Sequence, residues 1–284
     1  MRKEGVVSIL IPCYNHERFV DDCLDSILNQ TYRKFEVIIC DDASKDGSLQ
    51  KIYDKKPEFD KAGIRFVILK NDKNRGLTGT INHTLEHAEG EYFKTIASDD
   101  MLCEDYLEKM VGYMQEHANV KYVFCNCTRV TEESTYPVKE KDIIGPLLSK
   151  LTPCDEHMLI RNYENNEIPA PSMLFRMEVI DEFGNYDASI GIEDLDMTLR
   201  ILAKYPDGIR CIEECLVYYR ANSTSMSANT KAKGVRKRAK KMFVYSVKIA
   251  KKHRHSVPKE VYKKRIKKLY IDYIVLSIKL FFSK

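Results

Sequence analysis

Short apolar runs alternate with segments of helical periodicity along the first 125 residues of the chain. The run at 6–11 is rich in β-branched residues and ends at Pro12, and in the segment 17–29 the apolar residues recur at helical spacing. The same pair of patterns recurs and predicts strands at 6–11, 35–40, 65–69, 91–97 and 120–125. The predicted helices lie at 17–29, about 48–55, 78–88 and 104–117. This alternation predicts right-handed β-α-β units and a mostly parallel sheet flanked by helices.

The second half of the chain is less regular. Residues 129–168 show no clear period and contain three prolines, so we expect a long loop or lid there rather than a second core. A short strand is predicted at 174–175 and a helix over 177–183. Near the end, apolar residues at helical spacing predict two further helices whose other faces carry lysines and arginines, over about 235–250 and 258–280.

The formal net charge of +4 conceals two oppositely charged parts. Residues 229–284 contain 19 Lys and Arg against two acidic residues, a local charge of +17, and the remaining 27 basic and 40 acidic residues give 1–228 a charge of −13. The sequence therefore predicts a body, 1–228, and a basic amphipathic helical tail, 229–284. The apolar stretch at 270–282 is too short to span a bilayer. Nine cysteines without CxxC spacing, and no signal-peptide core, lead us to expect a cytoplasmic protein.

Acidic and polar residues follow the predicted parallel strands, at the edge where such sheets bind ligands. Asp41 and Asp42 come after the second strand, and Ser98, Asp99 and Asp100 after the fourth. Two adjacent carboxylates repel one another unless a cation lies between them, and oxygen ligands suit Mg²⁺ or Mn²⁺. Two simpler interpretations stay open: an Asx turn after the second strand, and a cap for the helix near residue 104. No Gly-rich phosphate loop is present, which disfavours a dinucleotide-binding dehydrogenase and a P-loop NTPase.

A third acidic cluster lies at 193–196, directly before a run of helical periodicity. Asp194 and Asp196 face apart on one helix, so one of them can serve as a base while the other caps the helix. A carboxylate at a helix start that faces a sugar hydroxyl is a suitable general base. Acidic residues also favour the positive end of a helix dipole, and this segment alone leaves both interpretations open.

The combination of these segments resembles a known family. The matching segments, in order along roughly residues 6–220, are 7–15 (VSILIPCYN), 26–32 (SILNQTY), 36–48 (EVIICDDASKDGS), 88–92 (AEGEY), 98–100 (SDD) and 191–196 (GIEDLD). Together they are similar to the family-2 glycosyltransferases with the GT-A fold. The resemblance implies a Rossmann-like sheet with a nucleotide-binding half at about 1–127 and an acceptor-side half at about 128–228. It also implies an inverting transfer of a sugar from a nucleotide-diphosphate donor, most often a UDP-sugar, to a hydroxyl acceptor.

The resemblance also assigns roles to single residues. Asp194 stands where the family has its catalytic base, with Glu193 beside it, and Asp99 and Asp100 stand at the D-x-D-type motif that holds Mn²⁺ or Mg²⁺. Ala97 replaces the first Asp of a frequent form of that motif. Asp42 corresponds to the residue that holds uracil. The resemblance implies nucleotide contacts for Pro12, Tyr14, Asp42, Arg75, Ser98 and Asp99. Phosphate contact or packing is left open for Tyr219, Arg220 and Ser225.

The tail lies beyond the resemblance and is interpreted from its own residues. Lysine-rich amphipathic helices suit an anionic membrane surface, and a lipid-linked acceptor would place the reaction there, peripherally on the inner face of the cell membrane. Alternatively, the apolar stripes pack on the acidic body. Nucleic acid is an unlikely partner, because no RNA-binding pattern accompanies the charge. By resemblance, the expected acceptor is a saccharide or lipid-linked intermediate of bacterial surface polysaccharide synthesis.

Two other functions were weighed against a glycosyltransferase. A sugar nucleotidyltransferase also uses carboxylates and a metal, but it would need a Gly-rich loop with Arg or Lys after the first strand, where this chain has Pro-Cys-Tyr-Asn. A non-enzymatic module would bind nucleic acid or protein through the basic tail. Metal-enhanced binding of UDP separates the first function from both alternatives.

Overall fold

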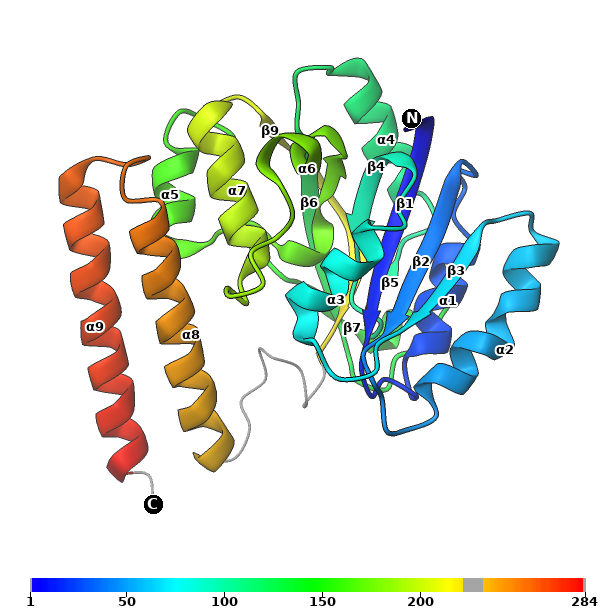
Figure 1. Ribbon diagram of the computed structural model, residues 1–284, viewed down its shortest axis with the longest axis horizontal. Coiled ribbons are helices and arrows are strands. Elements are labelled where there is room, and N and C mark those ends of the chain that lie inside the picture. The colour runs from blue at the N-terminus through cyan, green and yellow to red at the C-terminus, as the bar shows by residue number, and fades with distance from the viewer. Residues whose placement is uncertain (1, 222–231, 283–284) are drawn as a thin grey trace.

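The computed structural model describes residues 2–221 and 232–282 (Figure 1). The strands are β1 (Lys3–Cys13), β2 (Phe35–Asp41), β3 (Phe66–Lys70), β4 (Gly90–Thr95), β5 (Met101–Leu102), β6 (Tyr122–Val130), β7 (Ile143–Pro146), β8 (Leu174–Arg176) and β9 (Ile209–Arg220). The helices are α1 (Val20–Leu28), α2 (Ser48–Lys61), α3 (Gly76–Leu85), α4 (Tyr106–Glu116), α5 (Met158–Asn165), α6 (Glu178–Phe183), α7 (Glu193–Lys204), α8 (Ala232–Lys252) and α9 (Lys259–Phe282). The predicted α/β alternation is confirmed.

The described strands form one sheet in the order β3-β2-β1-β4-β8-β6-β9-β5, with β7 paired to β6. Strands β3, β2, β1 and β4 are parallel, as β-α-β units require, whereas β8 joins β4 and β6 antiparallel. The chain moves outward from β1 through β2 to β3 and then returns to place β4 on the other side of β1. This reversal opens a crevice at the carboxyl ends of β1 and β4, which is where ligands bind in such sheets.

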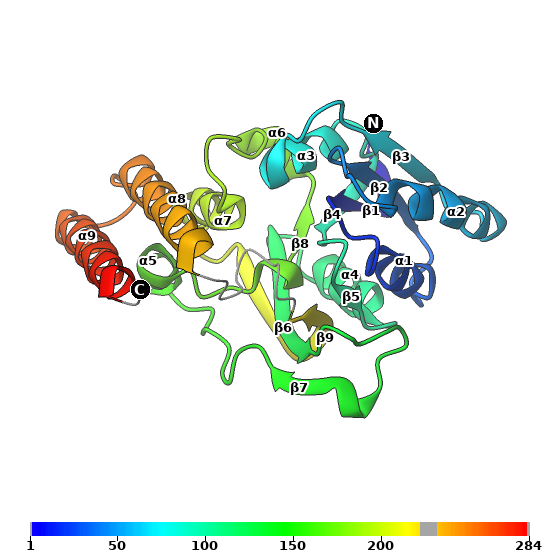
Figure 2. The ribbon, with the colours of Figure 1, turned by 90° about the horizontal axis from the view of Figure 1, so that it is seen from below.

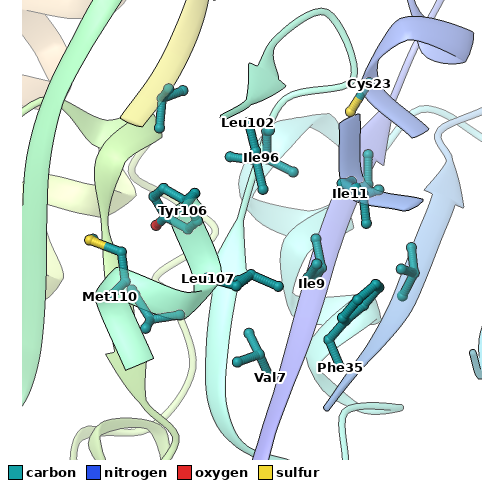
Figure 3. Packing of buried hydrophobic residues seen from close by; sticks show 14 of the residues in the cluster. Val7, Ile9, Ile11, Cys23, Phe35, Ile96, Leu102, Tyr106, Leu107 and Met110 are labelled. Carbon is teal, nitrogen blue, oxygen red and sulfur yellow. The ribbon is translucent and has the colours of Figure 1, made fainter. Parts of the chain in front are cut away.

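Hydrophobic residues cover both faces of the sheet because β1 and β2 are apolar on both sides. Val7, Ile9 and Ile11 of β1 point to the core shared with α1, α2 and α4 (Figure 3), and Leu10 points to the core shared with α3, α6 and α7. All four side chains are fully buried. This double burial identifies β1 as a central strand and fixes its register, since a shift of one residue would exchange the two sets.

The prediction of a structureless loop over 129–168 is wrong in part. Strand β6 continues to Val130, β7 pairs with its end, and α5 begins at Met158. Helix α5 is only eight residues long and is held by the buried side chains of Met158 and Tyr163. Such a short helix leaves little periodicity in a sequence, so tertiary packing rather than local pattern defines it.

The tail forms two long helices, and its first helix packs on the body (Figure 2). Val247, Ile249 and Ala250 of α8 join Leu195 and Leu199 of α7 in a third core, and Tyr163 donates a hydrogen bond to the carbonyl of Ala250 at 2.8 Å. The packing interpretation therefore holds for the inner face of α8 and for the first half of α9. Within the described residues, neither tail helix nor any other is long and apolar enough to cross a membrane.

Candidate active site

A pocket of about 100 Å³ lies at the crevice between β1 and β4. Pro12 at the end of β1, Ala97 and Asp100 after β4, and Glu193 and Asp194 at the start of α7 all line it. The topology thus brings together two acidic clusters that are 93 positions apart in the sequence, as the resemblance implied. Tyr14, Asp42, Arg75, Ser98 and Asp99 do not line this pocket, although they were predicted as donor contacts.

Asp100 is a buried carboxylate held at the floor of the site. Only 2% of the residue is exposed, and one carboxylate oxygen accepts a hydrogen bond from the backbone N–H of Arg220 at 3.0 Å. Burial, and then the charge of Asp99, raise the pKa of Asp100 well above its ordinary value. Helix α4 begins at Tyr106 with Asp105 as its cap residue, so neither Asp99 nor Asp100 has the capping role that was the simpler interpretation.

Asp99 faces the end of β1 rather than the pocket. Its Oδ1 lies 3.9 Å from Nδ1 of His16, and the same ring nitrogen is 2.8 Å from Oγ of Ser98. The Ser98 hydroxyl in turn donates to the carbonyl of Pro12 at 3.3 Å. His16, which the sequence did not single out, therefore ties the loop after β4 to the loop after β1.

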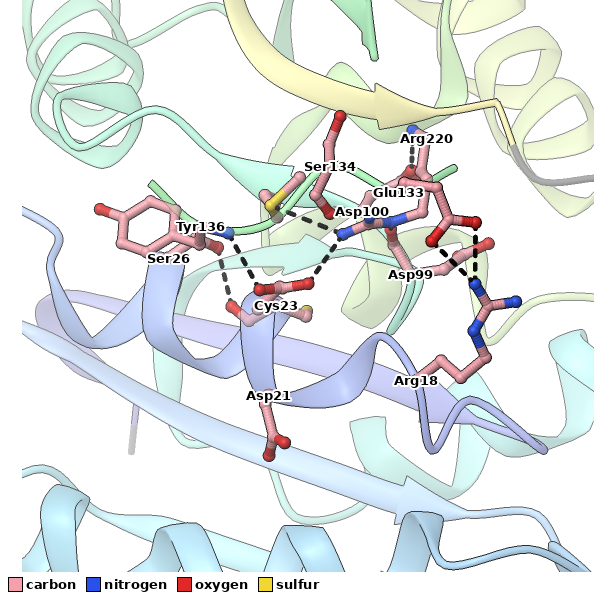
Figure 4. A network of polar contacts seen from close by, with 12 residues as sticks. Arg18, Asp21, Cys23, Ser26, Asp99, Asp100, Glu133, Ser134, Tyr136 and Arg220 are labelled. Atoms are coloured by element: carbon pink, nitrogen blue, oxygen red, sulfur yellow. Dashed lines mark hydrogen bonds and ion pairs between the residues drawn. The ribbon is translucent and has the colours of Figure 1, made fainter. Parts of the chain in front are cut away.

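Arg220, at the end of β9, holds the Asp99–Asp100 loop in place (Figure 4). Its Nε donates to the carbonyl of Asp99 at 2.8 Å, and its guanidinium pairs with Asp22 at 3.2 Å. The carbonyl of Ser134 accepts a further hydrogen bond from the guanidinium. Only 1% of Arg220 is exposed, so it has the packing role rather than the phosphate contact. Ser225, the alternative phosphate contact, lies outside the described residues.

Asp41 and Asp42 differ in how far their oxygens are satisfied. The Asp42 carboxylate accepts hydrogen bonds from the side chain of Asn71 at 2.8 Å and from the backbone N–H groups of Arg75 at 2.7 Å and Gly76 at 2.9 Å. Asp41 Oδ2 accepts one from the N–H of Ser44 at 3.1 Å, which is the turn contact weighed above. Asp41 Oδ1 is buried without a hydrogen-bond partner among the described residues. The unsatisfied acceptor at the end of β2 thus belongs to Asp41, and Asp42 fixes the loop before α3.

Glu193 and Asp194 are the first two residues of α7, and both are half-buried. The hydroxyl of Thr78 donates to Glu193 Oε2 at 3.4 Å. Burial and the neighbouring Asp194 raise the pKa of Glu193 to about 7, and burial raises the pKa of Asp194 against an opposing hydrogen bond from Asn166. Asp196 points the other way and pairs with His253 at 2.8 Å. The expectation that one of the two carboxylates caps the helix is wrong for Asp196, because the cap residue is Ile192 and Asp196 instead forms ion pairs with residues at the end of α8. The role of Asp194 as the base stays a prediction.

Comparison with known proteins places the chain in a family. The family described as "Glycosyl transferase family 2" matches residues 8–184, more than half of the chain. This chain belongs to glycosyl transferase family 2. The predicted family, and with it the enzyme class, is confirmed.

Relatives of this glycosyltransferase are named as glycosyltransferases, and one of them is named for teichuronic acid biosynthesis. EpsE of Bacillus subtilis, a putative glycosyltransferase, is 34% identical over 41% of each chain, and TuaG of the same organism, a putative teichuronic acid biosynthesis glycosyltransferase, is 28% identical over 79% of this chain and 82% of TuaG. The chain thus spans less than half the length of EpsE.

Solved structures show the fold. S. aureus TarS 1–349 in complex with UDP superimposes with a TM-score of 0.58 at 17% identity, over 87% of this chain and 65% of TarS. The mannosyltransferase PcManGT of Pyrobaculum calidifontis, in complex with GDP-Man and Mn²⁺, gives 0.56 at 19% identity, over 90% and 69%. The predicted GT-A-type fold of this glycosyltransferase is therefore confirmed.

In the described part of this glycosyltransferase, one group of three side chains is close enough together to hold a metal ion: His83, Glu86 and His87, at the end of α3. Asp99 and Asp100 supply two carboxylates by themselves. Their donor set suits Mg²⁺ or Mn²⁺, which commonly complete their shells with water and substrate phosphate oxygens. A cation would also offset the repulsion that raises the pKa of Asp100.

Lys94 is a further residue of the site that the sequence analysis did not select. It is fully buried in β4, and its ammonium group donates to the carbonyls of Thr95, at 3.0 Å, and Pro171. Burial lowers the pKa of Lys94 to about 8, and its charge acts on Asp100. The available signal was a lysine inside an otherwise apolar strand, since a fully buried lysine needs compensating partners.

Proposed function

We propose that this glycosyltransferase transfers a sugar, with inversion, from a nucleotide-diphosphate donor to a hydroxyl acceptor, and that the donor is a UDP-sugar. The observation that carries the proposal is the single pocket lined by both Asp100 and Asp194. A metal-binding carboxylate and a half-buried base on one small cavity are what a direct displacement needs. The nucleotidyltransferase alternative is less well supported, because the loop after β1 offers Pro12 and Tyr14 rather than phosphate-binding groups.

The proposed donor contacts lie at the ends of β1, β2 and β4. The Asp42 carboxylate is proposed to accept the imide N–H of uracil, as the resemblance implies, and the backbone N–H groups of Arg75 and Gly76 hold that carboxylate in place. Pro12 and the exposed ring of Tyr14 would flank the uracil ring. Asp99 and Asp100 would hold Mn²⁺ or Mg²⁺, which stabilises the charge on the departing diphosphate when bound.

Asp194 is the proposed general base. It would accept the proton of the acceptor hydroxyl as that oxygen attacks the anomeric carbon opposite the leaving diphosphate. Its raised pKa makes it a stronger proton acceptor than an exposed aspartate, and Glu193 contributes a second half-buried carboxyl beside it. One base suffices because an inverting transfer has a single displacement step.

Equilibrium binding of UDP tests the proposal. We expect Mn²⁺ to tighten UDP binding at least about tenfold, because Asp99 and Asp100, which repel one another, would hold a cation whose charge attracts the diphosphate. Titration calorimetry with UDP, with and without Mn²⁺, measures this difference in affinity. GDP is the control for the identity of the nucleobase. Binding that is indifferent to the metal for both nucleotides would count against the proposed donor site.

The proposed acceptor is a saccharide or a lipid-linked intermediate of cell-surface polysaccharide synthesis. Support comes from the name of TuaG and from an Escherichia coli relative, 30% identical over 45% of this chain and 48% of its own length, named UDP-Glc:alpha-D-GlcNAc-diphosphoundecaprenol beta-1,3-glucosyltransferase WfgD. Such an acceptor would place the enzyme on the cytoplasmic side, peripherally on the inner face of the cell membrane.

The second half of α9 is the surface proposed to meet an anionic bilayer. Its outer side exposes Tyr270, Ile271, Ile274, Val275 and Ile278, each between 44% and 54%. The first half of the same helix carries five lysines, at 259, 263, 264, 267 and 268. Apolar side chains beside a basic stripe are the combination that binds anionic lipid headgroups.

The double substitution Ile274→Glu/Ile278→Glu is expected to weaken binding to phosphatidylglycerol-containing vesicles at least about tenfold, because it removes apolar burial and adds negative charge. Deletion of the whole tail is a poorer test, since it would uncover the core between α7 and α8. Vesicle sedimentation measures the effect, with Tyr53→Glu on α2, an equally exposed apolar residue, as the control. Equal sedimentation of all three proteins would defeat the membrane proposal.

A further inference from the structure

A second and larger pocket, of about 360 Å³, lies between the start of α3 and the first turns of α8. Its lining includes four cationic side chains and no carboxylate. The residues that matter here are Arg75, Lys237, Arg238, Lys241, Met242 and Tyr245. A concave surface with charges of one sign concentrates a positive potential, which favours the binding of an anion.

Three cations of this pocket, Arg75, Lys237 and Lys241, differ from the two lysines that anchor α8 to the body, Lys248 and Lys252. Lys252 pairs with Asp196 at 2.9 Å, and Lys248 donates to the carbonyl of Ser189 at 3.1 Å, so these two hold α8 to the body. Arg75, Lys237 and Lys241 form no ion pair with any residue that the structure describes. Anchoring of the helix therefore does not explain the charges that line the pocket.

The pocket adjoins the catalytic carboxylates. Thr78 lines it and also donates to Glu193 Oε2, and Gly191, two residues before Glu193, lies against the ring of Tyr245. A Cβ at Gly191 would come within 2.6 Å of that ring, so α8 approaches this loop as closely as a glycine permits. An anion in the pocket would thus lie beside the base and away from Asp99 and Asp100, which do not line it.

The surface next to the pocket is apolar where α8 and α9 form it. Met242, in its wall, is 40% exposed, and the exposed apolar half of α9 runs alongside the same part of α8. In Figure 1 this end of both helices lies at the same end of the molecule as the carboxyl ends of β1, β2 and β3. The basic pocket therefore lies between the apolar half of α9 and the loop that leads to Asp194.

We propose that this pocket binds the diphosphate of a lipid-linked acceptor, with Lys237 and Lys241 as its principal ligands. The inference rests on the proposed function, because it gives the acceptor of that same site a chemical class: an isoprenoid diphosphate that carries the sugar to be extended. The diphosphate occupies the basic pocket, the lipid follows the apolar side of α8 and α9, and the sugar hydroxyl reaches Asp194.

Farnesyl diphosphate serves as the probe, titrated into the full chain in the presence of saturating UDP and Mn²⁺, which fill the donor site. We expect Lys237→Gln/Lys241→Gln to weaken its binding at least about tenfold, because two charge-assisted hydrogen bonds are lost. UDP affinity, measured in the same preparations, is expected to stay unchanged. The matched control Lys240→Gln/Lys251→Gln removes the same charge from α8 outside the pocket and is expected to bind like the unchanged protein.

Three results would overturn the inference: equal loss in both double variants, a parallel loss of UDP affinity in Lys237→Gln/Lys241→Gln, or inorganic pyrophosphate binding as tightly as farnesyl diphosphate. The second would assign the lysines to the donor, and the third would assign the pocket to a free anion. Failure of UDP to bind, with lysine-dependent binding of farnesyl diphosphate intact, would sink the proposed donor and leave the anion pocket standing.

Discussion

Replacement of Asp194 by Asn is expected to lower kcat about 10²–10⁴-fold, the range that a positioned general base contributes. The amide has nearly the same shape, so the start of α7 and the pocket around it keep their structure. What is lost is the oxygen that accepts the proton of the acceptor hydroxyl. UDP affinity is expected to stay unchanged, because the donor contacts lie at the ends of β1, β2 and β4.

The pH dependence of kcat/KM gives an independent check on the base. Burial raises the pKa of Asp194, and a base works only when ionised, so activity is present above that pKa and lost as the pH falls through it. The acid limb of the profile should therefore lie above the range of an exposed aspartate. The matched control for Asp194→Asn is Asp207→Asn, which removes an exposed carboxylate, since the side chain of Asp207 is 82% accessible. If Glu193→Gln causes the larger loss of kcat, the base is Glu193 and not Asp194.

The parts of the fold that follow from local periodicity could be predicted from the sequence. Strand β1 is recognisable because Val6–Ile11 is apolar apart from Ser8 and ends at Pro12, and the alternation with helices then implies a parallel sheet. The roles that place Asp100 and Asp194 in one site came from the resemblance as well as from the topology. Parallel strands explain why Asp100 lies at the carboxyl edge, but nothing local places the start of α7 opposite it.

Other features depend on contacts between distant residues and leave no local pattern. Arg220 is one residue in a segment where Tyr219 was an equal candidate, and only the fold shows that its guanidinium is buried against Asp22. The difference between Asp41 and Asp42 is likewise tertiary, because it is the loop before α3 that satisfies Asp42. The basic pocket needs Arg75 and Lys241 together, which are 166 positions apart.

Arg220→Met is expected to lower the free energy of unfolding by about 3–5 kcal/mol, the cost of breaking a buried ion pair by removing one partner. The substitution leaves Asp22 without its buried cation and leaves the carbonyls of Asp99 and Ser134 without their donor. Arg220→Lys keeps the charge but cannot reproduce the planar set of donors, so we expect an intermediate loss. Denaturant unfolding of the purified variants measures both.

Arg18→Met is the matched control, because Arg18 pairs with Glu132 and Glu133 at the surface next to the same loop, and its side chain is 60% exposed. An exposed pair of this kind contributes less than about 1 kcal/mol. Equal destabilisation by Arg18→Met and Arg220→Met would contradict the buried role of Arg220. Because the Arg220 side chain holds the backbone carbonyl of Asp99, directly before Asp100, its loss should also weaken the metal-dependent part of UDP binding, under conditions where the variant is still folded. The free energy of unfolding and the metal affinity would then both fall in Arg220→Met, and neither would fall in Arg18→Met. This is the pattern expected of a residue that positions the metal-binding loop.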